Sequence, residues 1–165
     1  GTDRLYEVAK KRKSDIYINV QGDEPLISPE DIKAVLQAAQ KEPGITFNAM
    51  CSITNQDDFS SSNVPKVVTR KDGRLLYMSR APIPTNKQLG FEKAMKQVCI
   101  YAYPRDVLIT FGSLKEKTPL ESIEDLEILR LVELGYEVKM IKVSGSSIAV
   151  DTPKDLEKVR GMIND

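Results

Sequence analysis

The strongest constraint on the fold of this chain is the alternation of short, β-rich apolar runs with segments that carry clear helix-start signals. The apolar runs cover residues 15–20, 45–53, 98–103 and 138–143. Between them, Ser28-Pro29 and Thr118-Pro119 each place a capping side chain before a proline, which suits the first turn of a helix. Strands that alternate with helices in this way predict an α/β sheet.

One segment departs from that alternation. Asp72-Gly73 is flanked by the strand-like runs 64–69 and 75–78, a pattern typical of an antiparallel β-hairpin. The proline-rich stretch 79–84 after it must be extended, because each proline restricts the residue before it. We therefore expect an antiparallel hairpin inserted into the α/β sheet.

The last third of the chain predicts two capped helices. Thr118 and Glu121 have the spacing of a capping box, and Thr152 and Asp155 repeat the arrangement. We expect one helix over 119–134, which Gly135 ends, and a second helix after residue 152.

The composition is that of an ordinary globular protein. Of 165 residues, 41% are hydrophobic and 29% are charged, and 24 basic side chains balance 24 acidic ones. A general binder of nucleic acid or of an acidic membrane would carry a basic surplus, so neither partner is expected.

No stretch approaches the roughly 18 apolar residues that a membrane span needs. Cys51 and Cys99 are too few and too far apart for a disulfide framework, which favours reduced cysteines in a cytoplasmic protein.

The chain contains no histidine. This excludes a Ser-His-Asp triad, a Cys-His dyad and a histidine-ligated metal within it. Acid–base or metal chemistry must therefore fall to Asp, Glu, Lys, Tyr or Cys side chains.

Two aspartates follow predicted strands. Asp23 lies in the turn after the run 15–20, and Asp151 lies directly before the last capped helix. In open α/β sheets, ligands bind beyond the carboxyl ends of the strands, and two carboxylates there could hold one Mg²⁺. The alternative is a structural role for each, Asp23 as a turn acid and Asp151 as a pre-helix acid.

The predicted helix 119–134 mixes carboxylates into its apolar face, where Glu121, Glu124 and Asp125 lie among aliphatic side chains. Partly buried carboxylates need partners, and Arg80, Lys66, the helix N-terminus or the hydroxyls of a sugar are candidates. The alternative is a solvated acidic edge on which Glu121 caps its own helix.

Two further positions suit either binding or structure. Arg80 follows a strand and precedes the stiff proline segment, which suits a clamp for a carboxylate or phosphate, although a plain surface arginine would fit as well. Tyr101 and Tyr103 share one face of a predicted strand, where packing in the core is the ordinary role.

Six blocks of the sequence, taken in order, resemble the 3-deoxy-manno-octulosonate (Kdo) cytidylyltransferases, or CMP-Kdo synthetases, of the sugar nucleotidyltransferase family. The blocks are Gly1-Thr2-Asp3-Arg4, Asn19-Val20-Gln21-Gly22-Asp23-Glu24-Pro25, Ser79-Arg80-Ala81-Pro82-Ile83-Pro84, Ile100-Tyr101-Ala102-Tyr103, Pro119-Leu120-Glu121-Ser122-Ile123-Glu124 and Val150-Asp151-Thr152-Pro153-Lys154-Asp155-Leu156-Glu157. The resemblance implies a Rossmann-like nucleotidyltransferase fold, a three-layer α/β sandwich with a mixed, mostly parallel sheet. It further implies a single domain over 1–165, incomplete at its N-terminus, with a hairpin and dimerisation insertion at about 64–96.

The resemblance also implies an activity. CMP would pass from CTP to Kdo with release of pyrophosphate, in a cytoplasmic, Mg²⁺-dependent homodimer that serves lipopolysaccharide or capsule synthesis. Asp23 and Asp151 would be the catalytic residues that hold Mg²⁺. The sugar site would be lined by Arg80, Gln97, Tyr101, Glu121 and Glu124. The nucleotide would lie near Gly1, Arg4 and Gln21.

The chain departs from the pattern of this family in two respects. It lacks the basic, glycine-containing loop that opens the family's sequences and wraps the CTP phosphates, so we expect a fragment that does not bind CTP by itself. Gln97 stands where the family usually has His, and Ile128 where it has Gln. At position 97 an amide offers both a donor and an acceptor. We therefore expect the sugar that receives CMP to be Kdo or another acidic sugar, such as 8-amino-Kdo or a nonulosonic acid. A non-enzymatic alternative is a fragment that keeps only the fold and the dimer interface.

Overall fold

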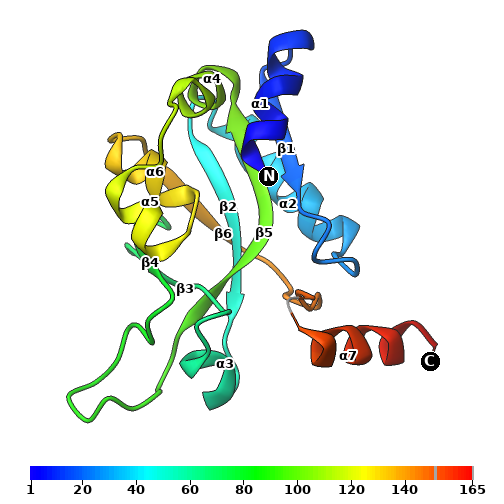
Figure 1. The fold of residues 1–165 in the computed structure, drawn as a ribbon, viewed down its shortest axis with the longest axis vertical. Coiled ribbons are helices and arrows are strands. Elements are labelled where there is room, and N and C mark those ends of the chain that lie inside the picture. Colours follow the sequence, from blue (N-terminus) through cyan, green and yellow to red (C-terminus); the bar gives the residue numbers. More distant parts are fainter. Residues whose placement is uncertain (151, 165) are drawn as a thin grey trace.

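The computed structural model describes residues 1–150 and 152–164, and its centre is a six-stranded mixed sheet (Figure 1). The strand order is β4-β3-β5-β2-β6, and β1 pairs with β5. The strands are β1 (Ile16–Val20), β2 (Thr46–Ser52), β3 (Lys66–Thr69), β4 (Leu75–Ser79), β5 (Met95–Pro104) and β6 (Val138–Lys142). The helices are α1 (Thr2–Lys11), α2 (Pro29–Lys41), α3 (Gln56–Ser60), α4 (Arg105–Ser113), α5 (Pro119–Glu124), α6 (Ile128–Glu133) and α7 (Pro153–Asn164).

The long strand β5 organises the sheet. It runs antiparallel to β1, β2 and β3, whereas β2 and β6 form a parallel ladder. The predicted α/β class and the mixed sheet are confirmed, but the expectation of a mostly parallel sheet is wrong for these ladders. The reason is the direction of β5. Its neighbours β1, β2 and β3 all run opposite to it, so each ladder that β5 forms is antiparallel.

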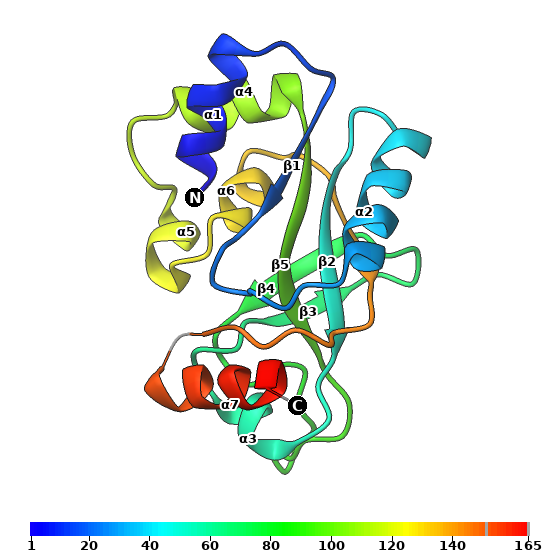
Figure 2. The ribbon, with the colours of Figure 1, turned by 90° about the vertical axis from the view of Figure 1, so that its right-hand side faces the viewer.

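Helices cover both faces of the sheet, which confirms the three-layer sandwich (Figure 2). On one face, Val98, Ile100 and Ala102 of β5 pack with Val35 and Ala39 of α2. On the other face, the alternate β5 residues Tyr101 and Tyr103 pack in a core that includes side chains of α1, α4 and α6. The alternation of side chains along β5 thus divides the core into two layers.

The predicted hairpin is present as β3 and β4, joined by a turn in which Gly73 has a φ of 86°. The turn folds back onto the far edge of the sheet, where the carbonyl oxygen of Gly73 accepts a hydrogen bond from the amide of Met140 at 2.8 Å. Arg74 also pairs with Glu137 at 2.6 Å. The hairpin therefore protects part of the edge of β6 that β2 leaves open.

The predicted single helix over 119–134 is divided into α5 and α6. Asp125 adopts the left-handed conformation, with a φ of 51°, and ends α5. The apolar spacing continues across the break, which is why the sequence indicated one helix. The break instead follows from long-range contacts, because the guanidinium of Arg80 binds the carbonyl oxygens of both Glu124 and Asp125.

The predicted helix starts are confirmed. Ser28 Oγ accepts a hydrogen bond from the amide of Glu30 at the start of α2, and Glu121 Oε2 accepts one from the amide of Thr118 before α5. At α7, the Thr152 amide donates to Asp155 Oδ2. Among the helices of the described residues, none is long and apolar enough to cross a lipid bilayer.

The close contact between α1 and α4 predicts how substitution of Gly112 changes the stability of the fold. A Cβ atom at Gly112 would lie 2.1 Å from the Tyr6 ring, whereas nothing lies within 4 Å of a Cβ at Gly161 in α7. We expect Gly112→Ala to lower the free energy of unfolding by about 1–3 kcal/mol, because the ring must be displaced. The matched change Gly161→Ala should raise it by about 0.5–1 kcal/mol, because alanine favours the helix. Urea denaturation followed by circular dichroism measures both, and an equal response of the two variants would contradict this packing.

Candidate active site

The turn after β1 is anchored on β5. The amide of Gln21 donates to the carbonyl oxygen of Cys99 at 3.2 Å, and the buried Glu24 accepts from the amide of Cys99 at 2.7 Å. These two bonds set the position of the intervening Asp23. Burial, together with the nearby Glu24 and Asp23 carboxylates, raises the pKa of Cys99 far above its ordinary value. Its thiol therefore stays protonated, and Cys99 is not an activated nucleophile.

Asp23 has the environment of a ligand-binding carboxylate. It is exposed, and its carboxylate accepts no hydrogen bond and forms no ion pair with any described residue. Its carbonyl oxygen accepts from the amide of Val150 at 2.8 Å, which brings the residue before Asp151 to the same place. Asp151 itself lies outside the described residues, so the shared Mg²⁺ stays a prediction. A free carboxylate of this kind suits Mg²⁺, which takes one or two carboxylates together with phosphate oxygens and water.

Gln97 and Tyr101, both predicted to line the sugar site, lie in contact. Gln97 Nε2 donates to the Tyr101 hydroxyl at 3.0 Å and to Asn48 Oδ1 at 2.9 Å. The Tyr101 ring is stacked on Tyr103, with centroids 5.7 Å apart, which confirms the core-packing interpretation. Burial is the largest cause of the raised pKa of Tyr101, so its hydroxyl acts as a hydrogen-bonding group and not as a base.

Asn48, which the sequence analysis missed, contacts the candidate site residue Gln97. It lies in β2 where the ladder with β5 changes register, and its Nδ2 donates to the carbonyl oxygens of Val98 and Ile100. The available signal was a polar residue inside an otherwise apolar strand. That pattern does not reveal the β-bulge that the side chain fills.

Glu124 is held at the end of β4 and not on a solvated edge. Its carboxylate accepts from Ser79 Oγ at 2.6 Å, from the Arg80 amide at 2.9 Å and from the Tyr77 hydroxyl at 3.2 Å. The Arg80 guanidinium binds the carbonyl oxygens of Glu124, Asp125 and Ser62. Arg80, one of the candidate partners, thus contacts Glu124 through its amide, and its side chain clamps the corner between α5 and α6.

Glu121 is enclosed, with 1% of its surface exposed. Its two carboxylate oxygens accept from Nε and Nη2 of Arg130, each at 2.6 Å, and Arg130 lies 3.9 Å from the Phe111 ring centroid. The partner is therefore Arg130, and neither Arg80 nor Lys66. The solvated edge is wrong for Glu121, because the pair closes the corner of α5 and α6 from inside, but the expectation that Glu121 caps its own helix is confirmed by its bond from the Thr118 amide.

Of the three residues predicted near the nucleotide, the structure brings two together. A Cβ atom at Gly1 would lie 3.1 Å from Gln21 Nε2, whereas Arg4 is exposed and pairs with Glu7. Glu127, which the sequence analysis missed, accepts from the Thr2 hydroxyl at 2.6 Å and so ties the start of α1 to α6.

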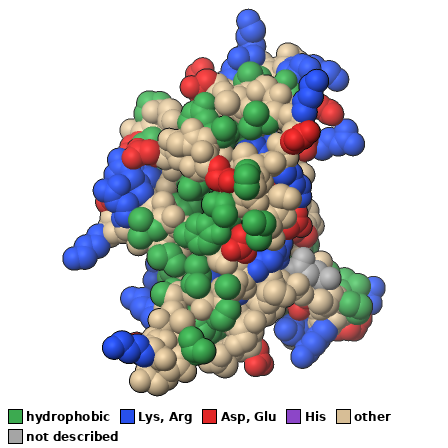
Figure 3. Space-filling view, turned by 60° about the vertical axis from the view of Figure 1, so that its left-hand side comes forward, with side chains coloured by type: hydrophobic (Ala, Val, Ile, Leu, Met, Phe, Trp, Pro, Cys, Tyr) green, Lys and Arg blue, Asp and Glu red, His purple; other side chains and the backbone are tan. Residues whose placement is uncertain are grey.

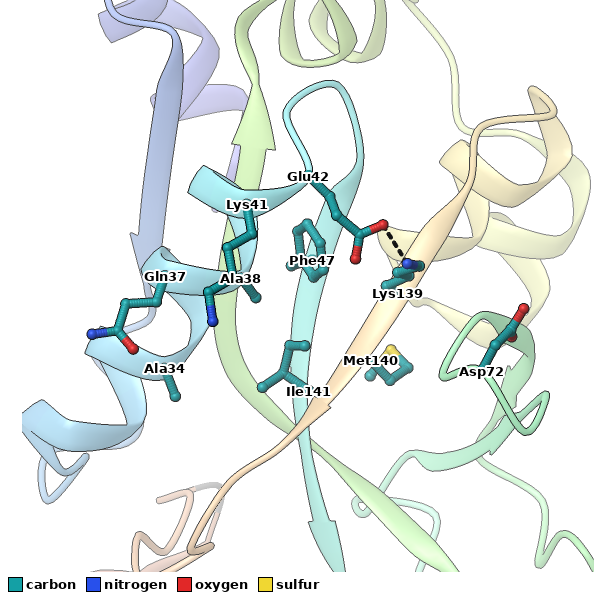
Figure 4. Close-up of a pocket in the computed structure, with 10 residues that line it drawn as sticks. All are labelled: Ala34, Gln37, Ala38, Lys41, Glu42, Phe47, Asp72, Lys139, Met140 and Ile141. Atoms are coloured by element: carbon teal, nitrogen blue, oxygen red, sulfur yellow. Dashed lines mark hydrogen bonds and ion pairs between the residues drawn. The ribbon is translucent and has the colours of Figure 1, made fainter.

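A pocket lies elsewhere, between α2 and β6 (Figure 4). It has a volume of about 310 Å³. Phe47 and Ile141 form part of its wall, and an ion pair between Lys139 and Glu42 lies at its side. Of the predicted site residues that the structure describes, none lines it.

The contacts of Glu124 predict a pH dependence. Burial opposes its ionisation, but the hydrogen bonds from Ser79, Arg80 and Tyr77 outweigh burial and lower the pKa of Glu124. A carboxyl whose folded-state pKa is depressed stabilises the fold above its unfolded pKa, about 4.3, and loses that contribution as the pH falls through the folded value. We expect Glu124→Gln to flatten the fall in unfolding free energy below about pH 4.5. Urea titrations at several pH values measure it, and an unchanged slope would contradict the assignment.

The fold is that of nucleotide transferases: a putative glucose-1-phosphate thymidylyltransferase from Bacillus anthracis superposes with a TM-score of 0.66 at 15% identity, covering 100% of this chain and 61% of that one. A similarity at this identity shows the fold alone. The sequence itself matches the family described as Cytidylyltransferase over residues 1–142. The chain belongs to the cytidylyltransferase family.

The more similar relatives carry a narrower name. The 3-deoxy-manno-octulosonate cytidylyltransferase of Escherichia coli is 40% identical over 163 residues, covering 99% of this chain and 66% of that protein. The enzyme of the same name from Geobacter metallireducens is 42% identical over 171 residues, covering 96% and 67%. The solved structure of CMP:2-keto-3-deoxy-manno-octonic acid synthetase complexed with CTP superposes with a TM-score of 0.88 at 40% identity, covering 99% and 67%. The chain thus spans about two thirds of the length of these relatives.

Proposed function

We propose that the protein transfers CMP from CTP to Kdo and releases pyrophosphate. The observation that carries this proposal is the exposed carboxylate of Asp23. The residues on either side of Asp23 bond to β5 and fix its position, and the carboxylate has no hydrogen-bond or ion-pair partner among the described residues. It stands in a chain that is similar along 99% of its length to CMP-Kdo synthetases.

The roles of the side chains follow from their contacts. Asp23, together with Asp151, would hold Mg²⁺, which neutralises charge on the nucleotide phosphates and orients them when bound. Gln21 lies beside Gly1 and so suits the nucleotide side of the site. Gln97 and Tyr101 suit the sugar side, where hydrogen bonds orient an attacking hydroxyl. The chain supplies no histidine for this reaction, and the roles assigned to it here are orientation and charge neutralisation.

The proposal extends to the assembly. The side of the molecule that carries α5 and the hairpin gathers hydrophobic side chains (Figure 3). Among exposed side chains of these elements, Leu76 is 54% and Ile123 is 79% exposed. Exposed apolar surface of this kind supports a homodimer formed through the hairpin region, about residues 64–96 within a single domain. We place the enzyme in the cytoplasm, where it would supply activated Kdo for lipopolysaccharide or capsule.

Pyrophosphate release tests the proposed function. The full-length protein that contains this chain is supplied with CTP and Mg²⁺, and with Kdo, 8-amino-Kdo or a nonulosonic acid in turn. We expect release that requires both the sugar and the metal. Release with none of these sugars would overturn the proposal, and the fold-only alternative would then stand.

A second candidate function is the same transfer to a different acidic sugar. It is favoured by the amide at Gln97, where the resemblance leads one to expect His. A higher kcat/KM for 8-amino-Kdo or a nonulosonic acid than for Kdo in the same assay would select it.

A further inference from the structure

The side-chain amide of Asn48 has one possible orientation. It fills the irregularity of the β2–β5 ladder, and it is fully buried. Two backbone carbonyl oxygens, those of Val98 at 3.0 Å and Ile100 at 2.9 Å, face its Nδ2. Carbonyl oxygens only accept, so the NH₂ group must point toward them and Oδ1 must point away.

The orientation of Asn48 fixes that of Gln97. Asn48 Oδ1 is an acceptor, so the Gln97 amide must turn its NH₂ group toward it, at 2.9 Å. The second proton of Gln97 Nε2 is directed to the Tyr101 hydroxyl at 3.0 Å. Both protons are therefore used, and Gln97 Oε1 accepts no hydrogen bond from any described residue. The half-buried Gln97 side chain is left with an acceptor alone.

We propose that Asn48 is a positioning residue that holds Gln97 with Oε1 toward the acceptor sugar, so that this position accepts a hydrogen bond and does not donate one. The inference rests on the proposed function. It narrows the sequence-based expectation, in which the amide offered both a donor and an acceptor. The group recognised on the sugar is then a hydrogen-bond donor, a hydroxyl or an ammonium, and a carboxylate oxygen at that place is disfavoured because two acceptors would face each other.

The orientation is tested first in the unmodified protein. In the full-length, ¹⁵N-labelled protein, both side-chain NH₂ protons of Gln97 should exchange with solvent at least about tenfold more slowly than those of the exposed Gln88. Exchange as fast as that of Gln88 would overturn the assignment. This measurement needs no variant and no turnover, so its result is independent of the proposed function.

A double-mutant cycle tests the positioning role. We expect Asn48→Ala to raise the KM for the sugar about five- to tenfold, with a smaller change in kcat, when Gln97 is present. In a Gln97→Ala background the same change should have less than about a twofold effect on KM, because Asn48 has no amide left to hold. A purely structural Asn48 would act equally in both backgrounds, and that result would overturn the inference.

The failure of the two proposals can be told apart. If the unmodified full-length protein releases no pyrophosphate with any of the three sugars, the proposed function fails, and the positioning role fails with it, whatever the exchange rates. If it turns over but the cycle is additive, only the positioning role fails. Should Asn48→Ala not fold, Tyr101→Phe removes one acceptor of Gln97 Nε2 without touching the bulge. The NH₂ protons of Gln97 should then exchange faster with solvent, and an unchanged exchange rate would contradict the assignment.

Discussion

Replacing Glu121 by alanine is expected to lower the free energy of unfolding by about 3–5 kcal/mol, because the change leaves the Arg130 guanidinium buried without its counter-charge. Glu121 and Arg130 are 1% and 5% exposed, and two hydrogen bonds of 2.6 Å join them. The loss is a large fraction of the 5–15 kcal/mol that stabilises a typical domain. Urea denaturation followed by circular dichroism measures it.

One control removes a glutamate from an exposed ion pair, and the other changes only the charge of Glu121. Glu7→Ala removes an ion pair with Arg4 that is exposed to solvent, and it should cost less than about 1 kcal/mol. Glu121→Gln keeps hydrogen-bonding oxygen and shape, and should fall between the two. A Glu121→Ala variant that is no less stable than Glu7→Ala would show that the pair does not hold the corner of α5 and α6.

Asp23→Asn is expected to lower the kcat of the full-length protein at least about 100-fold, because an amide is a poor substitute for a carboxylate ligand of Mg²⁺. The fold should be unaffected, because the carboxylate of Asp23 forms no hydrogen bond or ion pair with any described residue. The matched control is Asp57→Asn, at an exposed carboxylate in the first turn of α3. Pyrophosphate release at saturating CTP and sugar measures both. A kcat for Asp23→Asn within threefold of the Asp57→Asn value would contradict the metal-binding role.

The sequence predicted the elements whose signals are local. Ser28 and Pro29 mark the start of α2, and Asp72-Gly73 marks the hairpin, because a cap or a tight turn is decided by a few adjacent residues. The corner at Asp125 was not predicted, since the apolar spacing continues through it. Its cause lies in Arg80, 45 residues away in the sequence.

The same distinction holds in the candidate site. Asp23 was identified because a carboxylate just beyond an apolar strand is a local pattern. Asn48, Glu24 and Glu127 were missed because their partners lie 50, 75 and 125 residues away in the sequence. A polar residue in an apolar strand is visible from the sequence, but the bulge that gives Asn48 its role depends on how β2 pairs with β5.

The most direct test of CMP transfer is to identify the product by ³¹P NMR. The full-length protein is incubated with CTP, Mg²⁺ and Kdo while the spectrum is recorded. The account predicts that the three CTP phosphorus signals are replaced by one phosphodiester signal and one pyrophosphate signal. The two products should form in equal molar amounts. Conversion of CTP to CDP and inorganic phosphate, or a spectrum that stays that of CTP with every acidic sugar tried, would contradict it.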